Sequence, residues 1–243
     1  MTPTPIRIAM WSGPRNLSTA LMYAFAARGD CAVSDEPFYA AYLAATGIDH
    51  PMRDAVLASQ PTDPAVVAAR CTGAPPGDKP IWYQKHMTMH LLAAFDRGFL
   101  AQVTNVFLLR HPARVVASYA KKRETATLED IGFLQQAALF DQVAGMTGTA
   151  PPVITAEAIR LDPRAALTRL CAALGLPFIP AMLTWPAGPK LDDGVWAPHW
   201  YSAVHRSTGF EDPEGALPDL SAAQQRLVDQ ALPAYTQLLR HAL

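Results

Sequence analysis

IRIAMWSGPRNLST, at residues 6–19, is the stretch of sequence that decides the fold. Residues 6–11 form a short apolar run, which ends in the turn signal Ser-Gly-Pro at 12–14. From Asn16 onward, apolar residues recur at helical spacing until residues 28–30 close the segment. The pattern predicts a strand, a tight loop and a helix in succession.

Strands and helices are predicted to alternate along the rest of the chain. Apolar runs predict further strands at 31–34, 81–85, 104–109 and 153–155. Periodic segments predict helices at about 112–119, 128–146, 163–174 and 221–239, and Ser221 is the expected N-cap of the last one. This order implies an α/β fold, a P-loop-like parallel sheet of about five strands with helices on both faces. We expect residues 1–243 to form one domain, with a helical excursion at about 39–79 and a structured loop at about 185–212.

Amino-acid composition limits the kinds of molecule that this protein can bind. Half of the residues are hydrophobic and 17% are charged, so the chain can bury a sizeable core and is not globally disordered. The net charge of −1 argues against nucleic acid or an anionic membrane as the main partner. No secretory signal and no run of ~18 apolar residues is evident, and the three cysteines form no C-x-x-C. We therefore expect a cytoplasmic protein that binds any polyanion through a few well-placed positive groups.

The loop after the first strand is the first candidate binding site. In open parallel sheets, ligands bind at the carboxyl ends of the strands, and the N–H groups that begin the next helix attract anions. Ser18 and Thr19 add hydroxyl donors, and Arg15 adds a cationic fork suited to phosphate or sulfate. The loop is not a Walker A motif, because G-x-x-x-x-G-K-[ST] and its lysine are missing. The alternative interpretation is a plain junction in which Asn16 and the hydroxyls cap the helix.

A second candidate site follows the fourth predicted strand. Arg110 comes directly after the apolar run at 106–109, Pro112 follows it, and Ser118 lies two turns into the next helix. Arg110 and Ser118 either bind an anion or tie the strand to the helix. Two anion sites on neighbouring strand ends favour a nucleotide with phosphates at both ends, and ATP would not need the second site.

Both segments resemble the sulfotransferase family, in its bacterial sulfotransferase-like branch. The 5′-phosphosulfate loop of that family has the form P-[K/R]-S-G-[ST]-T, and residues 14–19 match its proline, its basic residue and both hydroxyls. Asn16 and Leu17 depart from it. Leu17 stands where the family has glycine, and leaves its backbone N–H free only if φ is negative. Residues 106–119 resemble the 3′-phosphate motif of the family, an apolar strand followed by R-x-P-x-x-x-x-x-S-x-[YWH].

The resemblance implies that the donor is 3′-phosphoadenosine 5′-phosphosulfate (PAPS). The acceptor would be a hydroxyl of a small molecule or carbohydrate, and the chemistry requires no metal. The resemblance assigns the 5′ end of the donor to Arg15, Asn16, Leu17, Ser18 and Thr19, and the 3′ end to Arg110 and Ser118. Arg206 is a further candidate, in a loop that could fold back over the 3′-phosphate or the adenine.

Two residues are candidates for the base that removes the proton from the hydroxyl group of the acceptor substrate. Glu36 lies in an E-P-F run that resembles bacterial carbohydrate-type sulfotransferases, some of which use that glutamate as base. His86 resembles the histidine of K-x-H in the animal enzymes, but here it directly follows Lys85. A shift of one residue would turn its side chain to the other face of a strand. Arg15 would stabilise charge on the leaving phosphate, and Lys85 could hold the acceptor or the sulfuryl oxygens.

The sequence allows three other interpretations. His86 and His90 have H-x-x-x-H spacing, which could bind zinc on a helix, but the glutamate of H-E-x-x-H is absent and no metal site is expected. The rival functions are a P-loop kinase of a small metabolite and a non-catalytic nucleotide-binding protein of the same fold. The missing Walker lysine counts against the kinase, whereas Leu17 makes the non-catalytic protein credible.

Overall fold

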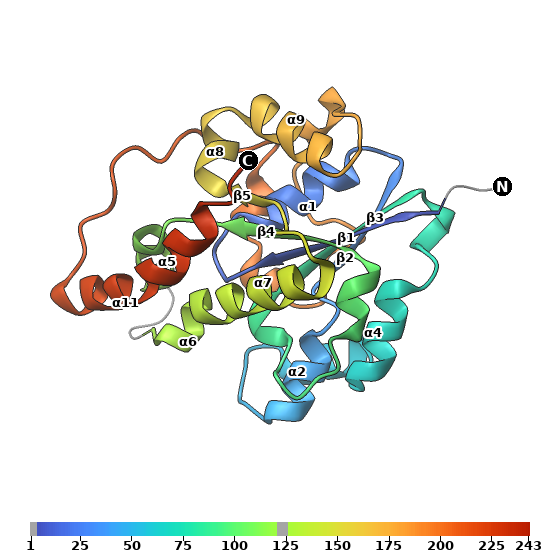
Figure 1. Ribbon diagram of the computed structural model, residues 1–243, viewed down its shortest axis with the longest axis horizontal. Helices are drawn as coiled ribbons and strands as arrows, with labels where there is room; N and C mark the ends of the chain where they lie inside the picture. The colour runs from blue at the N-terminus through green and yellow to red at the C-terminus, as the bar shows by residue number, and fades with distance from the viewer. Residues whose placement is uncertain (1–3, 121–125) are drawn as a thin grey trace.

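A five-stranded parallel sheet forms the centre of the molecule (Figure 1). The computed structural model describes residues 4–120 and 126–243. The strands lie in the order β2-β3-β1-β4-β5. Their bounds are β1 Ile6–Ser12, β2 Cys31–Asp35, β3 Ile81–Met87, β4 Thr104–Leu109 and β5 Val153–Thr155. The predicted α/β class is confirmed, and β3 runs on to Met87 instead of ending at Lys85.

Helices connect the strands and cover both faces of the sheet. Their bounds are α1 Ser18–Ala26, α2 Tyr39–Thr46, α3 Arg53–Ser59, α4 Pro64–Thr72, α5 Pro112–Ala120, α6 Leu128–Ile131, α7 Phe133–Thr147, α8 Ala156–Leu161, α9 Pro163–Ala173, α10 Ala197–Trp200 and α11 Ala222–Leu239. The helix predicted at 128–146 is divided into α6 and α7, because Gly132 between them adopts a φ of 74°. The unpredicted α8 follows β5 without a loop, since Thr155 ends the strand and also caps the helix. The predicted N-cap of α11 is confirmed, because the Ser221 side chain accepts a hydrogen bond from the Gln224 amide.

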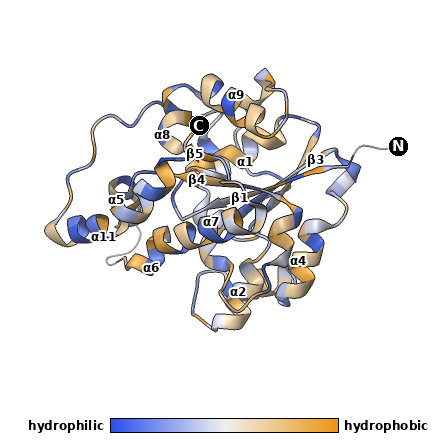
Figure 2. Cartoon of the chain, viewed as in Figure 1, coloured by the Kyte–Doolittle hydropathy of each residue, from blue (hydrophilic) through white to orange (hydrophobic). Residues whose placement is uncertain are grey.

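Alternate side chains of β1 face two separate cores. Ile8 and Met10 pack with residues of α1 and α9 on one face, whereas Ala9 and Trp11 pack with residues of α7 and α11 on the other. Figure 1 shows α1, α8 and α9 on one side of the sheet and α4 and α7 on the other. The ribbons of these helices alternate between hydrophobic and hydrophilic residues (Figure 2). The continuous apolar character of β1 thus follows from burial on both faces.

The direction of the chain across the sheet reverses at β1. From β1 the chain crosses to the edge strand β2 and returns through β3, and the next connection passes β1 to reach β4 and then β5. Connections that leave neighbouring strands in opposite directions open a crevice at the carboxyl ends of those strands. The loops after β1, β3 and β4 meet at this crevice.

Two segments far apart in the sequence pack together beside the crevice. The excursion at 39–79 contains α2, α3 and α4, and the loop at 185–212 contains α10. Tyr39 and Val56 from the excursion share an apolar cluster with Trp196 and Tyr201 from the C-terminal loop. The predicted helical excursion and the predicted C-terminal loop therefore form one wall beside the crevice.

Within residues 4–120 and 126–243, no helix has the length and apolar character needed to cross a bilayer.

Gly13 allows a close approach between the β1–α1 loop and α6. A Cβ at this position would lie 2.9 Å from the carbonyl oxygen of Ile131. We predict that Gly13→Ala lowers the free energy of unfolding by about 1–3 kcal/mol, as overpacking does elsewhere, measured by urea denaturation. The matched control is Gly145→Ala within α7, where a Cβ meets open space, and it should raise stability by about 0.5–1 kcal/mol. A Gly13→Ala protein as stable as wild type would contradict the close approach.

Candidate active site

A cavity of about 380 Å³ lies at the carboxyl ends of β1, β3 and β4. Most of the candidate residues from the sequence line it: Arg15, Asn16, Leu17, Ser18, Thr19, Glu36, Arg110 and Ser118. His86 and Arg206 do not line this cavity. The two candidate binding segments therefore share one cavity.

The backbone of the β1–α1 loop is left-handed at two positions. Arg15 has a φ of 62° and Leu17 has a φ of 71°. Leu17 therefore adopts the conformation that a glycine would allow, instead of the negative φ that a free Leu17 N–H was expected to require. This conformation costs a residue with a side chain roughly 1–2 kcal/mol. Packing of the Leu17 side chain against the core under α1 offsets that cost.

The N-terminus of α1 is open to the cavity. Leu17 is the N-cap, no side chain caps the helix, and its first turn holds no acidic residue. The first N–H groups of a helix have no acceptor within it, and with the helix dipole they favour an anion. The alternative in which Asn16 caps the helix is not realised. The Asn16 side chain is buried and donates to the carbonyl of Leu108 at 3.3 Å, which anchors the loop to the end of β4.

Direct hydrogen bonds join the two candidate binding segments. The Arg110 Nη1 donates to the Arg15 carbonyl oxygen at 2.7 Å, and the Arg15 Nε donates to the Ser118 Oγ at 3.0 Å. Burial and the neighbouring charge of Arg110 lower the pKa of Arg15. The β1–α1 loop and the β4–α5 segment therefore form one continuous basic wall.

Three arginines surround the carboxylate of Glu214 at the edge of the cavity. Arg110 donates from Nη2 to Oε1 and from Nε to Oε2, the latter at 3.1 Å. The Arg160 Nη1 lies 3.4 Å from Oε1, and the Arg114 Nε lies 3.7 Å from Oε2. Burial alone would raise the pKa of Glu214, but the hydrogen bond from Arg110 and the three positive charges lower it below its usual value.

A buried lysine holds two carboxylates at the opposite end of the cavity. The Lys85 Nζ lies 2.8 Å from Asp35 Oδ1, 2.6 Å from Glu36 Oε1 and 2.6 Å from the Tyr201 hydroxyl. Burial would lower the pKa of Lys85, but the charges of Asp35 and Glu36 raise it well above its ordinary value. Burial, together with the neighbouring charge of Glu36, raises the pKa of Asp35, although the charge of Lys85 lowers it. The lysine is therefore charged and fixed in place.

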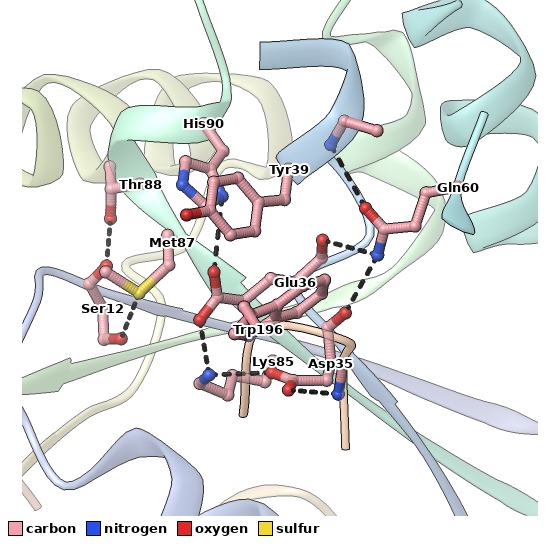
Figure 3. Close-up of polar contacts among 12 residues, drawn as sticks. Ser12, Asp35, Glu36, Tyr39, Gln60, Lys85, Met87, Thr88, His90 and Trp196 are labelled. Carbon is pink, nitrogen blue, oxygen red and sulfur yellow. Dashed lines mark hydrogen bonds and ion pairs between the residues drawn. The ribbon is translucent and has the colours of Figure 1, made fainter. Parts of the chain in front are cut away.

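Glu36 is positioned by the excursion as well as by Lys85. Its backbone has a φ of 43°, and the Gln60 side chain donates to the carbonyls of Asp35 and Glu36 at 3.3 and 3.2 Å. Figure 3 shows the Glu36 carboxylate between Lys85 and His90, with the His90 Nδ1 3.7 Å from Oε2. One carboxylate oxygen is thus bound by the lysine, and the other is directed towards a histidine.

The two histidines of the H-x-x-x-H run lie in different surroundings. His86 belongs to β3 and stacks on Trp11 with ring centroids 4.3 Å apart, away from the cavity. His90 lines the cavity and stacks on Tyr39 at 4.4 Å. The helix on which the two could share a zinc ion is not formed. Side chains alternate along a strand, so the shift of one residue seen in the sequence is enough to turn His86 away from Lys85.

Arg206 lies at the end of a short 3₁₀ helix, Val204–Arg206. It borders an adjoining depression, not the cavity itself, together with Asp162 and Arg164. The structure therefore does not bring Arg206 to the wall formed by Arg15 and Arg110.

Comparison with known proteins identifies the family. The chain matches the family described as "Sulfotransferase domain" over residues 6–242. It belongs to that sulfotransferase family. Two curated relatives from Arabidopsis thaliana are the branched-chain-amino-acid aminotransferase-like proteins 2 and 1. They are 36% identical over 234 residues and 38% identical over 238 residues. These matches cover 96% and 98% of this chain but 41% and 42% of the relatives, so the chain spans less than half of their length.

Solved sulfotransferases share the fold at low sequence identity. The sulfotransferase from Alicyclobacillus acidocaldarius has a TM-score of 0.56 and 11% identity, with coverage of 98% of this chain and 96% of that one. The sulfotransferase domain of the Synechococcus PCC 7002 olefin synthase has a TM-score of 0.53 and 18% identity, with coverage of 96% and 95%. These likenesses show that the chain has the same fold as those proteins.

Sequence reasoning missed three polar residues around the site. They are Arg114, Arg160 and Glu214. Arg160 is on the unpredicted helix α8, and Glu214 is on an irregular segment far from the motifs. Only Arg114 gave a local signal, because it lies in the first turn of α5, four residues after Arg110.

Acid should destabilise the folded protein through its buried histidines. Burial and the neighbouring His90 lower the pKa of His86 from 6.5 to about 3, and burial together with the charges of Lys85 and His50 lowers the pKa of His90. Below pH 6.5 the unfolded chain therefore binds protons that the folded chain does not, so stability falls as the pH falls. His86 alone accounts for a loss of about 2 kcal/mol between pH 7 and pH 5.

The variant His86→Gln should shrink this acid loss by about 2 kcal/mol, measured as the difference between urea unfolding free energies at pH 7 and pH 5. Taking the difference cancels any loss of stability that the variant shows at both pH values. His199→Gln, at an exposed histidine, is the matched control and should leave the acid loss in place. An unchanged acid loss in His86→Gln would mean that His86 is not buried as a neutral ring.

Proposed function

We propose that this sulfotransferase moves a sulfuryl group from PAPS to a hydroxyl of a small molecule or carbohydrate. One observation carries the proposal: Arg110 donates a hydrogen bond to the carbonyl of Arg15, and Arg15 donates one to Ser118, so the two candidate anion-binding segments form one wall of one cavity. A donor with phosphate groups at both ends of its nucleoside matches such a wall. The three cysteines are buried and free, which supports a cytoplasmic setting.

The donor would lie along this wall in a defined direction. Its 5′-phosphosulfate would bind at the N-terminus of α1, where the N–H groups and the hydroxyls of Ser18 and Thr19 favour an anion. Its 3′-phosphate would bind near Arg110 and Ser118. This direction places the sulfuryl group towards Glu36 and Lys85, which line the same cavity.

Glu36 is the proposed base, because it lines the cavity whereas His86 does not. In the transfer, the acceptor hydroxyl oxygen bonds to sulfur, and the bond from sulfur to the bridging oxygen of the 5′-phosphate breaks. The acceptor proton passes to the Glu36 carboxylate, and the electron pair leaves with the phosphate. Arg15 would stabilise the charge that develops on this leaving group. Lys85 fixes one Glu36 oxygen, which leaves the other to meet the acceptor.

The acceptor would enter beside an aromatic wall. Tyr39, His90, Trp200 and Tyr201 line the cavity on the side of Glu36. Such side chains supply apolar surface and hydrogen-bonding tips together, as binding a ring that carries hydroxyl groups requires.

Calorimetry with two nucleotides tests the donor. We predict that adenosine 3′,5′-bisphosphate binds with a Kd on the order of micromolar, and that ATP binds at least roughly tenfold more weakly, a difference of about 1.4 kcal/mol. Arg110→Ala should abolish bisphosphate binding, whereas Arg206→Ala, outside the cavity, should bind like wild type. Preference for ATP would favour a small-molecule kinase, and indifference to both nucleotides would remove the proposal.

A second variant separates the chemistry from binding. Glu36→Gln keeps the size of the side chain but cannot accept the proton, so we predict that kcat falls by about 10²–10⁴-fold while bisphosphate affinity is preserved. The assay is transfer of labelled sulfuryl from PAPS to a panel of phenols, alcohols and sugars. Glu129→Gln, at an exposed position on α6, is the control for the substitution itself. Full turnover in Glu36→Gln would show that another group is the base.

A further inference from the structure

Glu214 lies where an anionic ligand of the arginines would lie. Its two carboxylate oxygens take contacts from Arg110, Arg114 and Arg160, and all four side chains are between 11% and 15% exposed. Arg110 and Arg160 also line the cavity in which we place the donor. A carboxylate held by several guanidinium groups is the geometry in which proteins bind phosphate.

If Glu214 were removed, the remaining acidic side chains around the three arginines would not supply an anionic partner for Arg110. Two further carboxylates contact the arginines. The Glu157 Oε1 lies 3.8 Å from the Arg114 Nε but also accepts a hydrogen bond from the His111 amide, and Glu211 pairs with Arg160 at 2.9 Å while 61% exposed. Arg110 would then keep no carboxylate partner among the described ion pairs. Without Glu214, the guanidinium group nearest the Arg15 loop needs another anion.

Glu214 reaches the cluster from a segment that has no regular structure. Residues 210–221 form neither helix nor strand, and most of them are exposed. In Figure 1 this orange segment bows outward between the region of α8 and the start of α11. The contacts that hold it include Arg114 to the Gly215 carbonyl at 2.6 Å and Arg160 to the Asp212 carbonyl at 2.8 Å. The same arginines therefore hold both the carboxylate and the segment that carries it.

We propose that Glu214 is an internal substitute for the 3′-phosphate of the donor, and that Arg114 and Arg160 join Arg110 in binding that phosphate once Glu214 moves away. This inference rests on the proposed function and adds two binding residues and one competitor to it. The ligand class is a phosphate monoester, whose dianion carries more charge and more acceptor oxygens than a carboxylate. A nucleotide without a 3′-phosphate cannot displace Glu214 and gains nothing when it is removed.

The test compares two nucleotides that differ only in the 3′-phosphate. Adenosine 3′,5′-bisphosphate and adenosine 5′-monophosphate are titrated by calorimetry into wild type, Glu214→Gln and Asp219→Asn. Asp219 is an exposed acid of the same segment, so its variant removes an equal charge without touching the arginines. Glu214→Gln should bind the bisphosphate on the order of tenfold more tightly than wild type does, and it should bind the monophosphate as wild type does. Asp219→Asn should not show this gain in bisphosphate affinity.

Arg160→Gln in the Glu214→Gln background gives the second arm. It should weaken bisphosphate binding by roughly tenfold and leave monophosphate binding unchanged. Equal or weaker bisphosphate binding by Glu214→Gln, with wild type still binding it, would overturn the inference, because Glu214 would then orient the arginines and not compete. Absence of bisphosphate binding in wild type and in every variant would instead overturn the proposed function, and this inference with it.

Discussion

The hydrogen bond from the Arg110 guanidinium to the Arg15 carbonyl holds the site together. It crosses from the end of β4 to the loop after β1, and the Arg15 side chain then continues to Ser118 on α5. A parallel sheet makes this possible, because it brings the carboxyl ends of neighbouring strands to the same edge. Without this bridge, the strained loop at Leu17 and the arginines beyond Arg110 would be separate features. With it, they form one surface of a single cavity.

At the opposite end of the cavity, a buried ion-pair cluster around Lys85 fixes the side chains. A buried lysine between two carboxylates costs desolvation that only excellent geometry offsets, and Lys85 meets this condition with three short contacts. Tyr201 and Gln60 come from segments remote in sequence and fix the same group of side chains. The basic wall would bind the donor, whereas this rigid cluster would hold the base. In the proposed reaction the sulfuryl group passes between the two ends.

Much of the fold was predictable from local sequence, because strand and helix periods are local properties. The bounds of β4 and β5 and the N-cap Ser221 follow from patterns within a few residues. The position of the loop from Arg15 to Thr19 at the end of a strand was also predictable, and the structure shows that this loop lines the cavity.

The errors and omissions arose where tertiary packing decides. Leu17 adopts a left-handed φ because the core under α1 holds its side chain, and no local rule predicts that. Arg160 and Glu214 come to the site through contacts across more than fifty residues of sequence. His86 is the intermediate case: the strand alternation that turns it away from Lys85 was visible in the sequence, but its stacking on Trp11 was not.

The most direct test of the central claim, one nucleotide bound along one basic wall, is a crystal structure of the protein with adenosine 3′,5′-bisphosphate. The account predicts the 5′-phosphate at the N–H groups of Ser18 and Thr19 and the 3′-phosphate in contact with the Arg110 guanidinium. A nucleotide bound in the reverse direction, or outside the cavity between α1 and β4, would contradict it.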